Sequence, residues 1–337
     1  MKKILLDKNK KFYRGNMHCH STLSDGCFTP EELKALYKER GYSFLAITDH
    51  EHINDNSHLD DEDFITLTSG EFAIKQFAHE STMKNFDMKV CHLNLYAKRQ
   101  DNDYTFCYNS VADHFCAPER RDAINKPRVD YERIYGHEGI SKFIKDAGEQ
   151  GFFVCYNHPR WSLENYGDYS GYEGLWGVEI YNHSCAVDGL YDYDVNVLDD
   201  ILRDGNRVFA SCGDDNHNRG RNGLDYSFGA SVYVNAESLS YKNIVDGLLS
   251  GNFYSTMGPT IQYLYVENGQ VHIECSDAVQ ISYSTRGRRV KSVRAADGEL
   301  LREATFEIKD TDGYFRIDVI GTDGKRANTQ AYFLEEI

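Results

Sequence analysis

Short apolar runs alternate with amphipathic segments over roughly the first 258 residues, and this alternation is the feature that most constrains the fold. Because the runs are apolar throughout rather than at every second position, they are typical of parallel strands buried on both faces. Strands that alternate with helices in this way predict a parallel α/β barrel. The apolar runs lie at residues 44–48, 64–68, 152–156, 175–181 and 208–212.

Amphipathic helices are expected between these strands. The first begins at Thr29, where Pro30 at the first helical position and Glu32 in a capping box favour a helix start. Gly41 provides its stop. Three further helices are expected at residues 138–149, 190–204 and 238–250.

Two regions depart from the alternation. Residues 97–137 form a long, charged, Tyr-rich insert, which we interpret either as a lid over the site or as a surface excursion. Beyond residue 258, alternating apolar and polar runs are separated by turns such as Asn268–Gly269, a pattern that predicts antiparallel hairpins. We therefore expect a barrel over residues 1–258 and a small all-β sandwich over residues 259–337.

The charge of the chain narrows the class of partner. A net charge of -16 disfavours nucleic acids and membrane surfaces and favours a small-molecule substrate. The apolar run at residues 4–6 is too short for a signal peptide, and no run approaches a membrane span. The nine Cys residues, none with CxxC spacing, indicate a reducing compartment, so we expect a cytoplasmic protein.

Histidine and acidic residues gather where the apolar runs end. His18 and His20 are two positions apart, which on a strand places both imidazoles on one face. Because a barrel collects its catalytic groups at strand ends, we predict that the members of this set meet in one metal site. The remaining members are Asp25, His50, Glu71, His92, His158, Asp215 and His217.

Four short motifs resemble those of the polymerase-and-histidinol-phosphatase (PHP) superfamily, in their usual order, across roughly residues 15–255. They are His18-Cys-His20-Ser21 with Ser24-Asp25-Gly26, Thr48-Asp49-His50, Asn157-His158-Pro159, and Asp215-Asn-His217. The first and last of these motifs are the most specific. The resemblance implies a distorted seven-stranded β/α barrel, TIM-like in outline. Its strands are expected at residues 16–20, 44–48, 64–70, 152–156, 177–181, 207–212 and 230–234.

The resemblance also implies a trinuclear metal site with two or three divalent ions. One ion would use His18, His20, Glu71 and Asp215; a second would share Glu71 and add His92 and His158; a third would use Asp25, His50 and His217. Imidazole and carboxylate ligands suit Zn, Fe or Mn. The expected nucleophile is a metal-bound hydroxide, with Glu71 as the bridging carboxylate.

Several neighbouring residues are candidates for supporting roles. Asp49 is predicted either to orient a ligating histidine or to cap a helix. Arg160 is predicted to grip a phosphate bidentately, with a plain surface arginine as the alternative. Weaker candidates for the pocket are Arg219, Arg221, Asn182, Glu179 and His183.

The leading functional hypothesis is a metal-dependent phosphoesterase, an enzyme that hydrolyses a small phosphomonoester. Hydrolysis of a non-phosphate ester, amide or carbamate is the alternative among enzymes, because a fold does not fix a substrate. An alternative from another class is a polymerase-associated or regulatory metal-binding module. The acidic charge and the absence of polymerase sequence oppose that interpretation.

Overall fold

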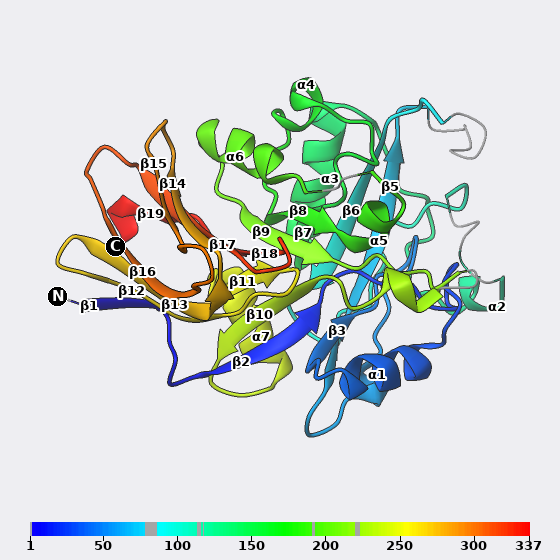
Figure 1. Ribbon diagram of the computed structural model, residues 1–337. Helices are drawn as coiled ribbons and strands as arrows, with labels where there is room; N and C mark the ends of the chain where they lie inside the picture. Colours follow the sequence, from blue (N-terminus) through cyan, green and yellow to red (C-terminus); the bar gives the residue numbers. More distant parts are fainter. Residues whose placement is uncertain (1, 78–85, 113–115, 117, 191–192, 220–222) are drawn as a thin grey trace.

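The computed structural model describes residues 2–337 except 78–85, 113–115, 117, 191–192 and 220–222, and it has a mixed α/β fold (Figure 1). Its paired strands form three sheets. The five-stranded sheet runs in sequence order, antiparallel from β5 to β7 and parallel from β7 to β9. Its strands are β5 (Ser69–Lys75), β6 (Val90–Ala97), β7 (Phe152–Tyr156), β8 (Gly177–Asn182) and β9 (Phe209–Gly213).

The largest sheet joins the N-terminal half of the chain to its C-terminal end. Its order is β15-β14-β17-β18-β11-β10-β2-β3-β4, with β19 paired to β17. From residues 1–258 come β2 (Lys11–Asn16), β3 (Phe44–Ala46), β4 (Ile65–Leu67), β10 (Ser231–Ala236) and β11 (Phe253–Thr256). From the C-terminal end come β14 (Gln280–Thr285), β15 (Val290–Arg294), β17 (Tyr314–Ile320), β18 (Arg326–Thr329) and β19 (Tyr332–Phe333).

A four-stranded antiparallel sheet packs against the C-terminal strands of the largest sheet, seen at the left of Figure 1. Its order is β1 (Lys2–Leu6), β12 (Ile261–Glu267), β13 (Gln270–Ala278) and β16 (Leu301–Glu307). Buried side chains from both sheets, including Leu264 and Ile317, form one core between them. Hairpins form at two of the predicted turns, between β12 and β13 at Asn268–Gly269 and between β17 and β18 at Asp323–Gly324, and the two sheets pack face to face.

Two strand pairings cross the predicted domain boundary at residue 258. The N-terminal strand β1 pairs with β12, and β18 pairs with β11. The division into two domains remains a prediction.

The longer helices lie close to their predicted positions: α1 (Pro30–Glu39), α3 (His137–Glu149), α6 (Val195–Arg203) and α7 (Tyr241–Leu249). The capping box of Thr29 and Glu32 forms as expected. In α3 the buried residues Ile140, Phe143, Ile144 and Ala147 follow the spacing of one helical face, which packs on the five-stranded sheet. The short elements are α2 (Pro118–Arg121), α4 (Tyr166–Tyr169), α5 (His183–Val187), η1 (Ser57–Leu59), η3 (Gly223–Tyr226) and η4 (Leu334–Glu336).

The strands of the described residues do not pair into one closed ring, so the expected TIM-like barrel is not shown. The largest sheet ends at β4, and the five-stranded sheet begins separately at β5. Strand β6 was not among the seven expected strands, and it runs antiparallel to both neighbours. All eight of its residues are buried, and burial on both faces gives an apolar run whatever the strand direction.

Residues 105–108 of the 97–137 insert are packed against the core. Phe106 contacts the rings of Phe143 and Phe152, and the hydroxyl of Thr105 accepts a hydrogen bond from the Ile53 amide at 3.0 Å. These contacts correct the interpretation as a plain surface excursion for this part of the insert. The role of a lid remains a prediction.

Candidate metal centre

Most of the predicted ligands lie in loops that follow strands, whereas Glu71 and His92 lie within β5 and β6. His18 and His20 follow β2, which ends at Asn16 rather than continuing to residue 20 as expected. Two isolated bridges, Cys19–Asn216 and His50–Glu71, bring the largest sheet and the five-stranded sheet together at this point. The strand ends of two sheets therefore converge on one site.

All nine predicted ligands come together in three adjoining groups, within each of which the ligand-type atoms lie within 4.8 Å of one another. The first group is His18, His20, Glu71 and Asp215; the second is Glu71, His92 and His158; the third is His20, Asp25, His50 and His217. The grouping matches the expectation except that His20 also belongs to the third group. Glu71 and His20 thus link the three groups.

Glu71 lies at the centre of the cluster. Its side chain is 1% exposed, and its two carboxylate oxygens face different imidazoles. Asn157 donates a hydrogen bond to Oε1 at 2.8 Å and holds the carboxylate in place. Oε1 lies 3.3 Å from His18 Nε2, 3.1 Å from His92 Nδ1 and 3.3 Å from His158 Nε2, and Oε2 lies 3.1 Å from His50 Nδ1 and 3.4 Å from His20 Nε2.

Two aspartates complete the cluster. Asp215 Oδ1 lies 3.0 Å from His20 Nε2 and 3.2 Å from His18 Nε2. Asp25 Oδ1 lies 3.2 Å from His217 Nε2. Each carboxylate therefore faces imidazole nitrogens from different loops.

The chemistry of these groups fits bound divalent cations. Among the described residues, the buried atom His20 Nδ1 forms no hydrogen bond. The Nε2 atoms of His18 and His20 also face each other at 3.3 Å. Buried polar atoms without partners are costly, and a cation between nitrogen and carboxylate oxygen atoms would satisfy them. The mixed set suits Zn, Fe or Mn.

The pKa shifts of Glu71 and His20 suit metal binding. Burial raises the pKa of Glu71, but the charges of His92 and His18 outweigh this effect and hold that pKa well below its usual value. Burial, assisted by the charges of His217 and His50, lowers the pKa of His20 to about 4. Glu71 is therefore ionised and His20 neutral near pH 7, as ligation requires. By contrast, nearby carboxylates raise the pKa of His18 and, to about 9, that of His50 despite their burial, so metal ions would compete with protons at those two imidazoles.

Glu179 and Asn182 contact the predicted ligands on the side away from the pocket and hold them in place. Glu179 Oε1 lies 3.0 Å from His18 Nδ1, and Oε2 accepts hydrogen bonds from the amide of His158 at 3.1 Å and from Asn182 at 2.9 Å. Asn182 also donates to Asp215 at 3.0 Å. Asn182 is fully buried and caps α5, so its predicted contact with substrate is corrected to a supporting role.

Asp49 organises the loop that carries two of the ligands. Its carboxylate accepts hydrogen bonds from the amide and hydroxyl of Ser21, at 2.7 and 2.6 Å, and from the hydroxyl of Ser24 at 2.7 Å. These serines lie between His20 and Asp25. The next residues form an isolated bridge and a turn, so Asp49 is not a helix cap.

Two ligands have backbone conformations that L-residues rarely adopt. The φ angles are 26° for His158 and 51° for Asp215, both in the left-handed region. Such strain persists only where surrounding contacts enforce it, and it concentrates at functional sites.

Seven of the nine side chains of the cluster line a pocket of about 310 Å³, and His18 and His20 do not reach it. The pocket walls include Lys75, Trp161 and Arg219, together with the small side chains of Ala73 and Ala112. The volume is suited to a small molecule.

The predicted arginines differ in their relation to this pocket. Arg160 is exposed and does not line it, because the turn after His158 instead places Trp161 over the cluster. The Trp161 ring lies 5.0 Å from the rings of both His92 and His158. Arg219 lines the pocket, donates to the carbonyl of Asp25 at 2.7 Å and pairs with its carboxylate. Arg221 lies outside the described residues.

His183 is held by ordinary hydrogen bonds away from the cluster. Its Nδ1 atom lies 2.9 Å from the Tyr181 hydroxyl, and its Nε2 atom lies 3.0 Å from the Asp225 carbonyl. It does not line the pocket.

Lys75 was not predicted, although the sequence contained a signal for it. Glu71, Ala73 and Lys75 occupy alternate positions of β5 and all line the pocket. Side chains two positions apart on a strand share a face, so placing Glu71 in the site also places Lys75 there.

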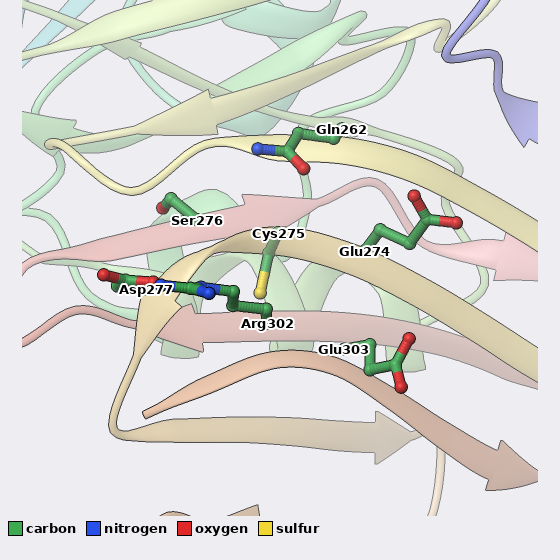
Figure 2. A pocket seen from close by; sticks show the side chains of 7 residues that line it. All are labelled: Gln262, Glu274, Cys275, Ser276, Asp277, Arg302 and Glu303. Carbon is green, nitrogen blue, oxygen red and sulfur yellow. The ribbon is translucent and has the colours of Figure 1, made fainter. Parts of the chain in front are cut away.

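A second, open depression of about 530 Å³ lies on the four-stranded sheet (Figure 2). Its lining includes Glu274 and Glu303, and no histidine is among the residues that line it. Its one cation, Arg302, donates to Asp277 at 2.6 Å. This depression is therefore separate from the cluster of predicted metal ligands.

No described helix is both long enough and apolar enough to cross a membrane.

No family model matches the chain, and no curated protein matches it. Among solved structures, it is similar to a two-domain protein from Bacteroides vulgatus that contains a predicted PHP-like metal-dependent phosphoesterase. That match has 13% identity and a TM-score of 0.46, and it covers 98% of this chain and 88% of the other.

Two further structures are similar over part of the chain. A proposed metal-dependent phosphoesterase from Bifidobacterium adolescentis has 14% identity and a TM-score of 0.36, covering 62% of this chain and 89% of the other. An amidohydrolase from Chromobacterium violaceum with bound sulfate has 16% identity and a TM-score of 0.36, covering 59% of this chain and 86% of the other. The solved structures similar to this chain thus include PHP-like metal-dependent phosphoesterases, at low sequence identity.

Proposed function

We propose that this protein is a metal-dependent hydrolase of small phosphomonoesters. The observation that carries the proposal is the convergence of nine His, Asp and Glu side chains in three adjoining groups; seven of these side chains line one pocket, while His18 and His20 lie buried behind it. Two or three divalent ions held there would lower the pKa of bound water and offset negative charge that develops on the substrate.

Three residues of the pocket and its surroundings would have distinct roles in metal binding and in the exclusion of water. Glu71, shared by two groups, would hold adjoining ions at a fixed separation. Glu179 would keep His18 oriented through the contact at Nδ1, leaving Nε2 free to bind a metal. Trp161 would cover one side of the pocket and exclude water from it.

An anionic substrate is supported by the cations of the pocket. Lys75 and Arg219 line it, although the chain as a whole carries a net charge of -16. The modest volume favours a small phosphomonoester over a polymer.

A neutral substrate is the second candidate. Arg219 is already engaged by Asp25, and much of the wall is apolar, with Ala73, Ala112 and Trp161. These features would also suit a carboxylic ester, an amide or a carbamate.

We also propose that the catalytic unit is the distorted β/α barrel implied by the sequence motifs, within residues 1–258. The bridges Cys19–Asn216 and His50–Glu71 support this proposal, because they join the two sheets around the cluster.

The test is a hydrolysis assay of purified protein supplied separately with Mn, Zn or Fe, against phosphomonoesters, nucleotides and carboxylic esters. Phosphate release from a small phosphomonoester is expected, and Glu71→Gln should abolish it while Glu173→Gln, at an exposed position, leaves it unchanged. Hydrolysis of carboxylic esters alone, or phosphate release that survives Glu71→Gln, would contradict the proposal.

A further inference from the structure

Lys75 is the feature of the pocket that the proposed reaction does not use. It lies on β5 on the same face as Glu71, with Ala73 between them, while Phe72 and Ile74 point into the core. Four residues of extended strand span about 13 Å, so the Lys75 backbone is well separated from the metal ligands. The Lys75 side chain therefore joins the pocket wall from a strand position distant from the backbone of Glu71.

The ammonium group of Lys75 has no counter-ion within the described part of the chain. Glu51 lines the same pocket, but its carboxylate pairs with Arg133 at 2.6 Å, and both side chains are almost fully buried. Glu51 also accepts a hydrogen bond from the Ala73 amide at 3.2 Å. No described residue forms a hydrogen bond or an ion pair with the side chain of Lys75. Burial lowers the pKa of Lys75, which a bound anion would offset.

The wall between the cluster and Lys75 is largely apolar. Ala73 lies on the strand between Glu71 and Lys75, and Ala112 and Trp161 line the same pocket. Trp161 is 40% exposed, which leaves a broad ring surface for a ligand. The pocket wall thus combines candidate metal ligands, apolar side chains and, four residues along β5 from Glu71, a cation without an ion-pair partner among the described residues.

We propose that Lys75 is a specificity-determining residue that binds a second anionic group of the substrate, far from the scissile phosphate. This inference rests on the proposed phosphomonoester hydrolysis and narrows its substrate class. The substrate is then a small molecule with a phosphomonoester at one end, a carboxylate or phosphoryl group at the other and an apolar or planar middle.

The test compares linear alkyl phosphates of equal length that end in a methyl group, a carboxylate or a phosphonate. Charge-assisted hydrogen bonds of this kind are worth about ten- to hundred-fold in binding. Lys75→Gln should raise KM by that factor for the doubly anionic substrates, leave their kcat nearly unchanged and leave the methyl-ended substrate unaffected. Lys75→Arg should retain most of the preference. The two anionic ends distinguish a carboxylate from a phosphoryl group as the natural partner.

Lys98→Gln is the matched control, because Lys98 is exposed and does not line the pocket, and the change in net charge is the same. Equal losses on all three substrates with Lys75→Gln, or no preference of the wild-type protein for a doubly anionic substrate, would overturn the inference while leaving the proposed function intact. Failure of the wild-type protein to hydrolyse any of the three would overturn both.

Discussion

Glu179 shows how one buried carboxylate positions several candidate ligands at once. It contacts His18 Nδ1, the amide of His158 and the side chain of Asn182. Glu179→Gln keeps the shape of the side chain but removes its charge, so it should misorient His18 without unfolding the protein. We expect metal affinity to fall by about 10- to 100-fold, measured by competition with a chromophoric chelator. Unchanged affinity would show that Glu179 is not a positioning residue.

At the same scale, the sequence predicts which side chains gather but not which way each one points. Most of the nine residues of the cluster could be predicted because they follow or lie within an apolar run, and Asp25 because it belongs to the motif Ser24-Asp25-Gly26. Arg160 and Asn182 also follow strands, yet one is exposed and the other is buried against Glu179. Their directions depend on a turn and a helix cap that only the folded chain defines. Lys75 could have been identified from its even spacing to Glu71.

Strand β5 is the element whose placement matters most to the site. A Cβ atom added to Gly70 would lie 2.1 Å from the backbone carbonyl oxygen of His52, which cannot move aside easily. Gly70→Ala should therefore push β5 away from the loop after His50 and displace Glu71. We expect a loss of about 1–3 kcal/mol in the free energy of unfolding, together with weaker metal binding.

Gly148→Ala provides the control for this prediction. Gly148 lies in α3, and an added Cβ would meet no atom within 4 Å. The substitution should stabilise the protein by about 0.5–1 kcal/mol, because alanine favours a helix interior. Urea unfolding of the two variants measures both effects. A Gly70→Ala variant as stable as the wild-type protein would contradict the close packing of β5 on this loop.

The elements themselves were predicted more securely than their pairing. Helices α1, α3 and α7 begin and end within a few residues of expectation, because capping residues and helical periodicity are local signals. The direction of β6 cannot be predicted from local sequence, because a strand buried on both faces has the same apolar pattern whether it is parallel or antiparallel to its neighbours. The expected parallel order therefore failed between β5 and β7.

At the scale of the whole molecule, a buried ion network links the C-terminal strands of the largest sheet to α6. Arg316 on β17 lies 2.6 Å from Asp318 and 3.0 Å from Asp199 on α6, and its side chain is 4% exposed. Arg316→Ala would leave two aspartates without this partner. We expect the free energy of unfolding to fall by about 3–5 kcal/mol, measured by urea unfolding.

Arg302→Ala is the matched comparison. Arg302 pairs with Asp277 on the surface of the four-stranded sheet, where the Arg302 side chain is 76% exposed. An exposed pair contributes about 0–1 kcal/mol. Equal effects of the two substitutions would mean that the link between α6 and β17 does not stabilise the fold. Because strand pairings also cross residue 258, we expect one cooperative unfolding transition for the intact chain.

The most direct test of the central claim is the number of divalent ions bound per chain. Metal-free protein equilibrated with Mn or Zn, then analysed for metal after dialysis, should retain two or three ions. Glu71→Ala should retain at most one, because two of the three groups contain Glu71 and only the group of His20, Asp25, His50 and His217 lacks it. Circular dichroism should show that the variant is folded. A wild-type protein that retains no metal, or a Glu71→Ala variant that retains as much as the wild type, would contradict the account.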